Sequence, residues 1–387
     1  MNILVVQESD WVEKGPHQSH HLFERLSVKG HKIRVIDFEI SWRSHEKELF
    51  SKRKVFKNQH KAIKDGNITV IRPPIIKLPL LEYFSLIHSH RKEIKKQIKE
   101  FHPDVIVGFG ILNANIAINL AKKNKIPFVY YIIDSLNTLV PQKFLRKIAK
   151  IIERRNMVGS DKVLSINEGL REYTARMGAD LKKTDVIRAG IDFKRYNLKI
   201  KGGSLRKEYG IKDDELVLFF MGWLYDFSGL KEVASSLLGH KKIKLLIVGE
   251  GDAYEDLKKI KDRFGDKIIL TGKQPFEKIP KFISASDVCL LPAYNNEVMR
   301  DIVPIKMYEY MAMEKPVIST KLPGIILEFG NDNGVIYVDK PEDVVEKVLE
   351  LSKKNRIGLE GKKARKFVEK NSWDGLTDEF EEYLFEL

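Results

Sequence analysis

The chain has 387 residues, of which 43% are hydrophobic and 32% charged, and its formal net charge at pH 7 is +14. At roughly 100–200 residues per domain this length predicts two domains with a core each, and no uninterrupted apolar run approaches the ~18–20 residues that a transmembrane helix needs. The one cysteine, Cys289, excludes a disulfide framework and a thiolate zinc cluster, and its apolar neighbours predict a buried, inert thiol. No basic stretch precedes the apolar residues at the start of the chain, so we expect a cytoplasmic rather than a secreted protein.

The excess positive charge lies in the first half of the chain. Residues 1–195 contain 37 lysines and arginines against 21 aspartates and glutamates, whereas residues 196–387 contain 31 against 33. This polarity favours an anionic partner for the first half, such as an acidic metabolite or a phospholipid surface. A lysine-rich solvated surface is the alternative. We expect no nucleic-acid partner, because basic and aromatic residues do not interleave as in known nucleic-acid-binding modules.

In chain order, short β-branched runs that end in Gly, Pro or Asp alternate with longer amphipathic stretches, a rhythm typical of βαβ units. In the first half this rhythm predicts strands at residues 2–6, 32–38, 68–71, 105–109, 128–133, 162–166 and 185–188. The helices predicted between these strands are residues 19–29, 85–101, 113–124, 145–159 and 168–177.

The second half repeats the same alternation. Its predicted strands are residues 216–221, 244–248, 267–271, 288–291, 316–319 and 334–338. Its predicted helices are residues 229–238, 254–264, 279–285, 305–313 and 341–355. The pattern predicts an α/β protein with two doubly wound, Rossmann-like parallel-sheet domains, joined near the polar stretch 197–210, with ligands beyond the carboxyl ends of the strands.

The densest group of residues that carry chemistry lies at 300–319. Pro304 fixes the backbone where a helix is predicted to begin, and the free N–H groups of a helix start form an anion site. Lys306 and Glu309 are three residues apart, so they lie on one face of that helix. This pair suits a nucleoside diphosphate, with Lys306 on the phosphates and Glu309 accepting from the ribose hydroxyls. A surface ion pair on an amphipathic helix is the alternative.

This stretch resembles the donor signature of the retaining glycosyltransferases of family 4, also called glycosyl transferases group 1, which have the GT-B fold of two Rossmann-like domains facing a central cleft. In that signature a carboxylate stands eight positions before a Glu, and Met-Ala and Pro-Val-Ile follow. Asp301 and Glu309 occupy the two carboxylate positions here, and Pro316, Val317 and Ile318 supply the final element. The family usually has Glu where Asp301 stands, and Glu297 is a candidate substitute.

The resemblance continues along the second domain in the family's order. Three glycines that follow predicted strands are expected to line the donor site, namely Gly222, Gly249 and Gly272. The family's basic phosphate-binding pair is replaced by Trp223 and Ser228, and Lys306 is the best replacement for the lost cations, ahead of Lys231 and Arg300. Residues 188–192 resemble the family's Asn-Gly-Val-Asp element.

The resemblance also implies the division of the chain. It gives an acceptor-binding domain at residues 1–190, a donor-binding domain at residues 191–370, and a C-terminal helix at residues 371–387 that packs back on the first domain.

Three further candidate site residues lie in the first domain. Asp134 follows a predicted strand where the family often has an acidic residue after a histidine, and the resemblance makes it a cleft residue. Gly15 and His17 belong to the loop before the first helix, where His17 is expected to contact the acceptor or the donor phosphate. His17 and His21 have the i,i+4 spacing of shared metal ligands. Because no third ligand is evident and GT-B donors are generally held without a divalent metal, we expect no metal and no cofactor.

The apolar, proline-broken segment 71–87 leads into the lysine-rich helix predicted at 85–101. Apolar anchors beside cations are what binding to an anionic lipid surface requires. We therefore expect the first domain to dock peripherally on the inner face of the cell membrane. An ordinary core helix covered by solvated lysines is the alternative.

Together these features predict a retaining hexosyltransferase that moves a sugar from a nucleoside diphosphate to a lipid-linked or glycan acceptor in glycan or glycolipid biosynthesis. Lys306, Asp301 and Asp134 are the predicted catalytic residues, and Lys306 and Glu309 are predicted to bind the donor with the three glycines. Two alternatives stay open. One is a GT-B sugar-nucleotide epimerase, and the other is a catalytically silent protein that binds nucleotide sugar or membrane, which the missing basic pair favours.

Overall fold

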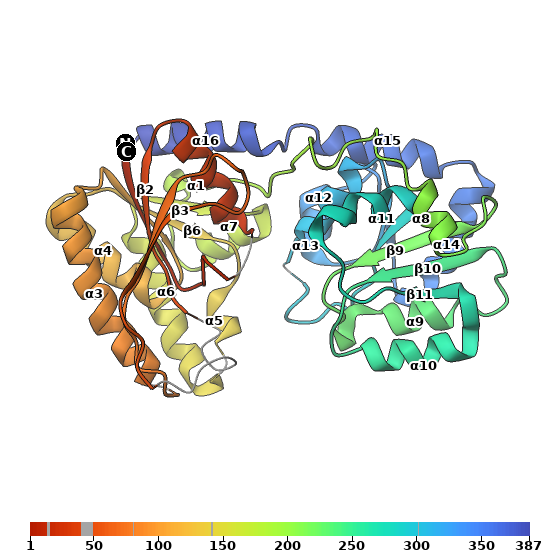
Figure 1. Cartoon of the computed structure of the whole chain (residues 1–387), viewed down its shortest axis with the longest axis horizontal. Helices are drawn as coiled ribbons and strands as arrows, with labels where there is room; N and C mark the ends of the chain where they lie inside the picture. Colours follow the sequence, from red (N-terminus) through yellow and green to blue (C-terminus); the bar gives the residue numbers. More distant parts are fainter. Residues whose placement is uncertain (14–15, 40–48, 80, 141, 301) are drawn as a thin grey trace. The chain divides into compact units, whose positions relative to one another are not determined.

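The computed structural model describes residues 1–13, 16–39, 49–79, 81–140, 142–300 and 302–387. The chain forms two compact units, each described here by itself (Figure 1). Unit 1 consists of Met1–Arg188 and Trp373–Leu387, and unit 2 of Ala189–Ser372. No helix among the described residues is long and apolar enough to cross a membrane.

The sheet of unit 1 is formed mostly by parallel strands. In chain order its strands are β1 (Asn2–Gln7), β2 (Lys32–Ile36), β3 (Lys54–Gln59), β4 (Ile68–Arg72), β5 (Val105–Phe109), β6 (Phe128–Ile132), β7 (Lys162–Ser165) and β8 (Thr184–Val186). Their order across the sheet is β3-β4-β2-β1-β5-β6-β7-β8. Strands that follow β1 are added on one side of it up to β4 and on the other side from β5 onward. The carboxyl ends of β1 and β5 therefore form the switch point, where ligands of such sheets bind.

Strand β3 was not predicted from the sequence, and it is the one antiparallel member among the described strands of this sheet, paired with β4. Its residues are exposed or half-buried, in contrast to the fully buried β5 and β6. A polar strand at the edge of a sheet has no apolar run or clean alternation. The sequence pattern on which the other strands were predicted is therefore missing here.

Helices cover both faces of this sheet. They are α1 (Gln18–Val28), α3 (Leu81–Phe101), α4 (Leu112–Asn124), α5 (Leu136–Leu139), α6 (Arg146–Gly159), α7 (Glu168–Arg176) and α16 (Trp373–Phe385), with short 3₁₀ turns η1 (Lys143–Leu145) and η2 (Leu181–Lys183). Helix α16, from the far end of the sequence, lies beside α1 (Figure 1).

Ion pairs hold α16 to unit 1. Arg25 contacts Asp374 at 2.9 Å, and Lys29 contacts Asp378 at 2.6 Å. Because residues 373–387 carry six acidic and no basic side chains, unit 1 as a whole has 35 basic against 26 acidic residues, and unit 2 has 33 against 28. The charge polarity of the two sequence halves is thus reduced to +9 against +5 in the folded units.

Unit 2 has a fully parallel sheet. Its strands are β9 (Leu216–Met221), β10 (Ile243–Val248), β11 (Ile268–Leu270), β12 (Val288–Leu291), β13 (Val317–Thr320) and β14 (Val335–Val338). They lie in the order β11-β10-β9-β12-β13-β14. This is the doubly wound order with a switch point between β9 and β12, so the predicted α/β fold class is confirmed.

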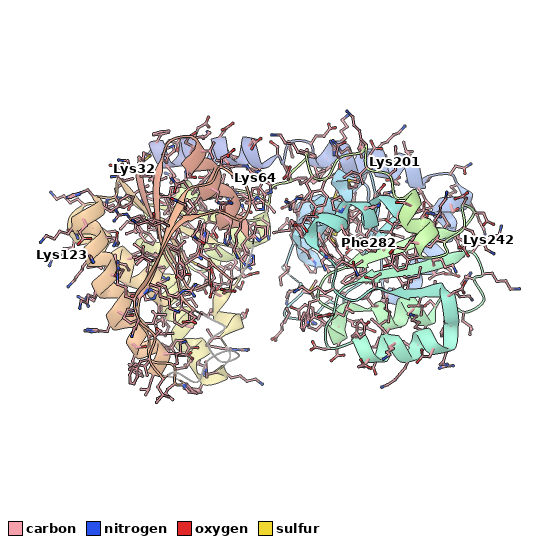
Figure 2. All side chains as sticks on the ribbon, viewed as in Figure 1. Lys32, Lys64, Lys123, Lys201, Lys242 and Phe282 are labelled. Carbon is pink, nitrogen blue, oxygen red and sulfur yellow. The ribbon has the colours of Figure 1, made fainter. Side chains whose placement is uncertain are left out.

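The helices of unit 2 are α8 (Gly203–Glu208), α9 (Leu230–Ser235), α10 (Tyr254–Phe264), α11 (Ile279–Ala285), α12 (Ile305–Ala312), α13 (Pro323–Phe329), α14 (Val344–Lys353) and α15 (Ile357–Val368). The 3₁₀ turns of the unit are η3 (Asp226–Ser228), η4 (Gly265–Lys267), η5 (Phe276–Lys278) and η6 (Pro341–Asp343). The core beneath them is apolar, and Phe282 of α11 points inward while Lys242 projects into solvent (Figure 2).

The stretch 197–210, expected near the junction of the domains, begins eight residues after the division between the units and belongs to unit 2. It contains α8, where the Arg206 guanidinium donates to the carbonyl oxygen of Ala285 at 3.0 Å. Ser284 Oγ also donates to the carbonyl oxygen of Ile200 at 2.7 Å. These bonds fasten the stretch to α11, and the division between the units falls earlier, at Arg188 and Ala189.

Candidate functional site

The carboxyl ends of β9 and β10 approach each other closely in unit 2. Gly222 follows β9 and Gly249 follows β10, with φ values of 132° and 146°. A Cβ at Gly249 would lie 1.9 Å from the carbonyl oxygen of Gly222, so no larger residue fits without moving the backbone. These two predicted donor-site residues therefore bring two strand ends together beside the switch point. Gly272 is bound to the same edge, because its carbonyl oxygen accepts from the N–H of Gly249 at 3.0 Å.

Helix α12 follows β12, across the switch point from β9, and it carries Lys306 to the end of β9. A Cβ at Gly222 would lie 2.6 Å from Lys306 Nζ, and this ammonium also stands 4.2 Å from the centroid of the Phe220 ring. Among the residues that the structure describes, Lys306 forms no hydrogen bond or ion pair. Burial lowers the pKa of Lys306 to about 8, against the opposing effect of the Glu309 carboxylate. A cation without a bonded counter-ion at a switch point is suited to an anionic ligand.

Glu309 lies one turn beyond Lys306, and one of its oxygens is already engaged. Tyr196 Oη donates to Glu309 Oε1 at 2.5 Å. Burial raises the pKa of Glu309, whereas the Tyr196 hydrogen bond, Lys306 and Arg195 act in the opposite direction. No described residue donates to the other oxygen, Oε2, which is therefore available to accept from a ligand.

Sequence reasoning missed Tyr196 and Arg195. Both follow the turn at Asp192, whose side chain accepts from the N–H of Arg195 at 3.1 Å and whose carbonyl oxygen accepts from the N–H of Tyr196 at 2.8 Å. The Arg195 guanidinium stands over the ring of Phe276 at 4.4 Å from the centroid. The sequence signal that could have found them is the element 188–192, because its last residue, Asp192, positions Arg195 and Tyr196.

A tyrosine on the buried side of α12 fixes the helix against β9. The backbone N–H of Met221 donates to Tyr310 Oη at 2.9 Å, and the Tyr310 ring packs edge-on against Phe219 with centroids 5.7 Å apart. Because Met221 directly precedes Gly222, this hydrogen bond fixes the position of α12 along β9. It thereby holds Lys306 beside Gly222.

The two positions where the family resemblance implies cations have different surroundings. Trp223 is 53% exposed, and its indole N–H donates to Asp252 at 3.4 Å. Ser228 is buried. Lys231, a second candidate replacement for the lost cations, contacts Asp226 and Asp256, each at 3.6 Å. Lys306, by contrast, has no such acidic partner within the described ranges.

Two predicted site residues, Asp301 and Gly15, lie outside the residues that the structure describes. Glu297, the candidate substitute for Asp301, is exposed.

In unit 1 the corresponding switch point is occupied by the chain's own carboxylate. Glu8, at the end of β1, accepts from the N–H groups of Ile111 at 3.0 Å and Asn113 at 2.8 Å, at the start of α4. Burial raises the pKa of Glu8, and these N–H groups lower it. A helix start that already holds a carboxylate disfavours a phosphate by repulsion. An anionic ligand is therefore disfavoured at this switch point.

The histidines before and within α1 have separate environments. His17 is exposed at the N-cap of α1, and its backbone N–H donates to Nδ1 of His20 at 3.1 Å. His20 is buried against Trp11, and burial lowers its pKa to about 4, so this ring is neutral. His21 stacks on Trp373 with centroids 4.1 Å apart. Within the described ranges no group of three residues is arranged to hold a metal ion.

Asp134 follows β6 on the carboxyl side of the sheet in unit 1. It is half-buried, and burial raises its pKa to about 6. No described residue forms a hydrogen bond with its carboxyl group. The neighbouring helix α5 is fixed to α6, because Asn137 Nδ2 of α5 donates to buried Glu153 of α6 at 2.6 Å. Tyr173 Oη donates to the same carboxylate at 2.8 Å. The carboxyl group of Asp134 is thus without a hydrogen-bond partner among the described residues, beside a helix that hydrogen bonds hold in place.

Two doubly wound parallel-sheet units in one chain are the architecture of the GT-B fold. Family comparison agrees for each unit. Residues 18–195 match Glycosyltransferase Family 4, and residues 216–354 match Glycosyl transferases group 1. Both units of the chain thus match glycosyltransferase family models.

Two relatives from Bacillus subtilis (strain 168) are named as teichuronic acid biosynthesis glycosyltransferases. TuaC is 25% identical over 248 residues, which cover 62% of this chain and 59% of TuaC. TuaH is 24% identical over 190 residues, which cover 47% of this chain and 45% of TuaH. The matches thus span about half the length of these relatives.

Solved structures show the same fold at low sequence identity. Sucrose-phosphate synthase from Thermosynechococcus elongatus has a TM-score of 0.75 at 15% identity, covering 100% of this chain and 99% of that one. HepE from Anabaena, solved with UDP, has a TM-score of 0.74 at 14% identity, with both chains covered completely. HepE has also been solved with UDP-glucose.

Proposed function

We propose that this protein is a retaining glycosyltransferase that moves a hexose from a nucleoside diphosphate, of which UDP is the first candidate, to a lipid-linked or glycan acceptor. The observation that carries the proposal is the position of Lys306, an ammonium without a bonded counter-ion beside Gly222 at the switch point of unit 2. The UDP and UDP-glucose complexes of HepE support the choice of base. The naming of TuaC and TuaH for teichuronic acid biosynthesis supports a glycan acceptor.

Both site residues of α12, Lys306 and Glu309, bind the donor. The Lys306 ammonium binds the diphosphate, and Glu309 Oε2 accepts from a ribose hydroxyl while Tyr196 holds Oε1. An ammonium about 4 Å from a phosphate, at an effective dielectric constant of about 20, contributes roughly 4 kcal/mol of attraction. One half-buried lysine therefore offsets much of the loss of the basic pair at Trp223 and Ser228.

In the transfer step the bond between the anomeric carbon and the β-phosphate oxygen breaks, and its electron pair stays on the phosphate. The acceptor oxygen forms the new bond from the same face, and its proton passes to the departing phosphate oxygen. Lys306 stabilises the charge that grows on that oxygen. Asp134 in unit 1 accepts a hydrogen bond from the acceptor and orients it. No metal or other cofactor takes part.

A lipid-linked acceptor lies in a membrane, so the proposal includes contact between the enzyme and a membrane surface. Unit 1 meets an anionic membrane peripherally, on its cytoplasmic side, and unit 2 binds the donor.

The test is a panel of radiolabelled nucleotide sugars, each incubated with the protein with and without a membrane lipid extract. Transfer of label to the lipid fraction from one donor is the expected result. Conversion of the free nucleotide sugar without an acceptor would identify an epimerase instead. Binding of UDP with neither reaction would identify a silent nucleotide-binding protein.

A further inference from the structure

Large apolar side chains are exposed together at one end of unit 1. They form a surface that we call the apolar tip, consisting of Leu49, Phe50, Leu78, Leu81, Phe84 and Phe144. Its three phenylalanines are 66–70% exposed, which is unusual for rings of this size.

Hydrogen bonds join the chain segments of this tip. The N–H of Lys77 donates to the carbonyl oxygen of Leu49 at 2.8 Å, which places the segments after β2 and β4 side by side. Tyr83 Oη in the first turn of α3 donates to Gln142 Oε1 at 3.4 Å, just before η1. Leu78 lies one turn before α3. The tip is thus one surface, formed by loops at the carboxyl ends of β2, β4 and β6.

Helix α6 continues the tip with a second exposed apolar row. Phe144, Ile148 and Ile151 are spaced by four and three residues, so they share one face, and the two isoleucines are each 54% exposed. Lysines flank this row at exposed positions, namely Lys143, Lys147 and Lys150.

The exposed face of α6 carries cations without acids. The segment 143–155 contains six basic residues and one acidic residue, Glu153. Glu153 points inward, where it accepts from Asn137 and Tyr173. Apolar side chains surrounded by cations, with the acid turned away, match an anionic lipid surface in both polarity and charge.

We propose that the apolar tip and the exposed face of α6 form the membrane-docking surface of this protein, and that its partner is an anionic lipid bilayer. This inference rests on the proposed function and deepens it by naming the surface. Docking through the carboxyl-end loops of the unit 1 sheet would bring a lipid-linked acceptor to the same edge of the sheet as Asp134.

Three of the α3 lysines that the sequence pattern singled out, Lys95, Lys96 and Lys99, lie away from the apolar tip. Lys96 follows Phe84 by twelve residues along one helix, or about 18 Å at 1.5 Å per residue. Lys95 and Lys99 instead line a shallow groove of about 680 Å³ beside the end of α4. Lys123, also in that groove, projects from the end of α4 (Figure 2). Since β5 begins just after α3 ends, this groove is at the amino end of the strand, away from the tip.

The charge test compares two triple variants of the full chain. Vesicles of phosphatidylcholine with about 30% phosphatidylglycerol are sedimented with wild type, with Lys143→Gln, Lys147→Gln and Lys150→Gln, or with Lys95→Gln, Lys96→Gln and Lys99→Gln. At about one kcal/mol per cation near the surface, the α6 triple variant should lose roughly a hundredfold in partitioning, and the α3 variant less than about threefold. A larger loss in the α3 variant would overturn the proposal.

The apolar test uses Phe84→Ser with Phe144→Ser, against Leu238→Ser with Leu359→Ser as a matched pair of exposed positions in unit 2. The binding that persists at about 1 M salt, where charges are screened, should disappear only in the phenylalanine pair. Equal losses in both pairs would contradict the assignment. UDP binding is measured for every variant by calorimetry. A wild type that binds UDP but no vesicle overturns the docking surface alone, whereas vesicle binding without UDP binding overturns the proposed function and leaves the surface in place.

Discussion

Tyr196 and Glu309 are joined by a 2.5 Å hydrogen bond, in which the buried phenol donates to a carboxylate oxygen 113 residues away in the sequence. The bond fixes the orientation of Glu309 and favours its charged form over the neutral acid that burial favours. A carboxylate held in this way can accept from a ribose hydroxyl without first reorganising.

The first prediction concerns the charge of Glu309. Glu309→Gln keeps the shape of the side chain but loses charge-assisted acceptance, which is worth roughly 1.5–3 kcal/mol per bond. The affinity for UDP in calorimetric titration should fall about tenfold or more. Unchanged affinity would remove Glu309 from the donor site.

Removal of the Tyr196 hydroxyl should change the pH dependence of UDP binding. Tyr196→Phe deletes a bond that lowers the pKa of Glu309, so this pKa rises further. As pH falls, Glu309 is then neutralised earlier, and the affinity for UDP should decline at a higher pH than in wild type. Tyr209→Phe is the control, because Tyr209 has no contact with Glu309. Identical pH profiles for Tyr196→Phe and wild type would contradict the positioning role.

UDP binding near pH 8 should be accompanied by protonation of Lys306. Its pKa of about 8 in the free protein means that the ammonium is lost as pH rises through 8, so UDP affinity should fall there. Because a bound diphosphate raises this pKa, binding near pH 8 should take up a proton. Titrations in buffers of different ionisation enthalpy measure that uptake, and Lys306→Met should abolish it.

Kinetics test the same residue in the transfer step. Lys306→Met should reduce kcat more than it raises KM, because charge grows on the phosphate as the bond breaks. A KM defect with normal kcat would contradict this role. Adding Trp223→Arg or Ser228→Lys to Lys306→Met should restore part of the rate if these positions face the same diphosphate.

The charged carboxylate of Asp134 is predicted to lower the free energy of unfolding while it supports activity. Its pKa of about 6 lies above the unfolded value of 3.8, so the charged form destabilises the fold as pH rises from about 4 to 6 and stays unfavourable at pH 7. Asp134→Asn should therefore stabilise the protein by about 1–2 kcal/mol at pH 7, after allowance for its partial exposure. The same change should lower kcat and remove the loss of activity below pH 6. A variant less stable than wild type would contradict the destabilising charge, and a fully active variant would contradict the role of Asp134 in the transfer step.

The contact between the ends of β9 and β10 predicts a steric effect at Gly249. Gly249→Ala would place a Cβ 1.9 Å from the carbonyl oxygen of Gly222 at a φ of 146°. The free energy of unfolding should fall by roughly 2–4 kcal/mol, and UDP binding should weaken with it. Gly203→Ala is the matched control, since a Cβ there meets nothing within 4 Å. Equal melting temperatures for the two variants would rule out the close approach.

The local pattern of the sequence was sufficient for most of the fold and for the helix that carries the site. Buried parallel strands such as β5 and β10 are continuous apolar runs, and the three-residue spacing of Lys306 and Glu309 places them on one helix face whatever surrounds it. Motif resemblance added Gly222 and Gly249, because a strand end that approaches another backbone closely requires glycine. These features depend on neighbours in the chain, which a sequence displays directly.

Contacts between distant segments had to come from the tertiary structure. The sequence does not bring Tyr196 to Glu309, nor Lys306 to the face of Phe220, because each pair joins segments about 90 to 110 residues apart. The edge strand β3 was missed because pairing with β4, rather than its own apolar pattern, makes it a strand. The sequence pattern predicts membrane contact through the lysines of α3, whereas the proposed docking surface uses those of α6, because twelve helical residues keep Lys96 about 18 Å from Phe84. Only the fold places α6, sixty residues beyond Phe84, beside the tip, because non-local packing decides which exposed side chains share a surface.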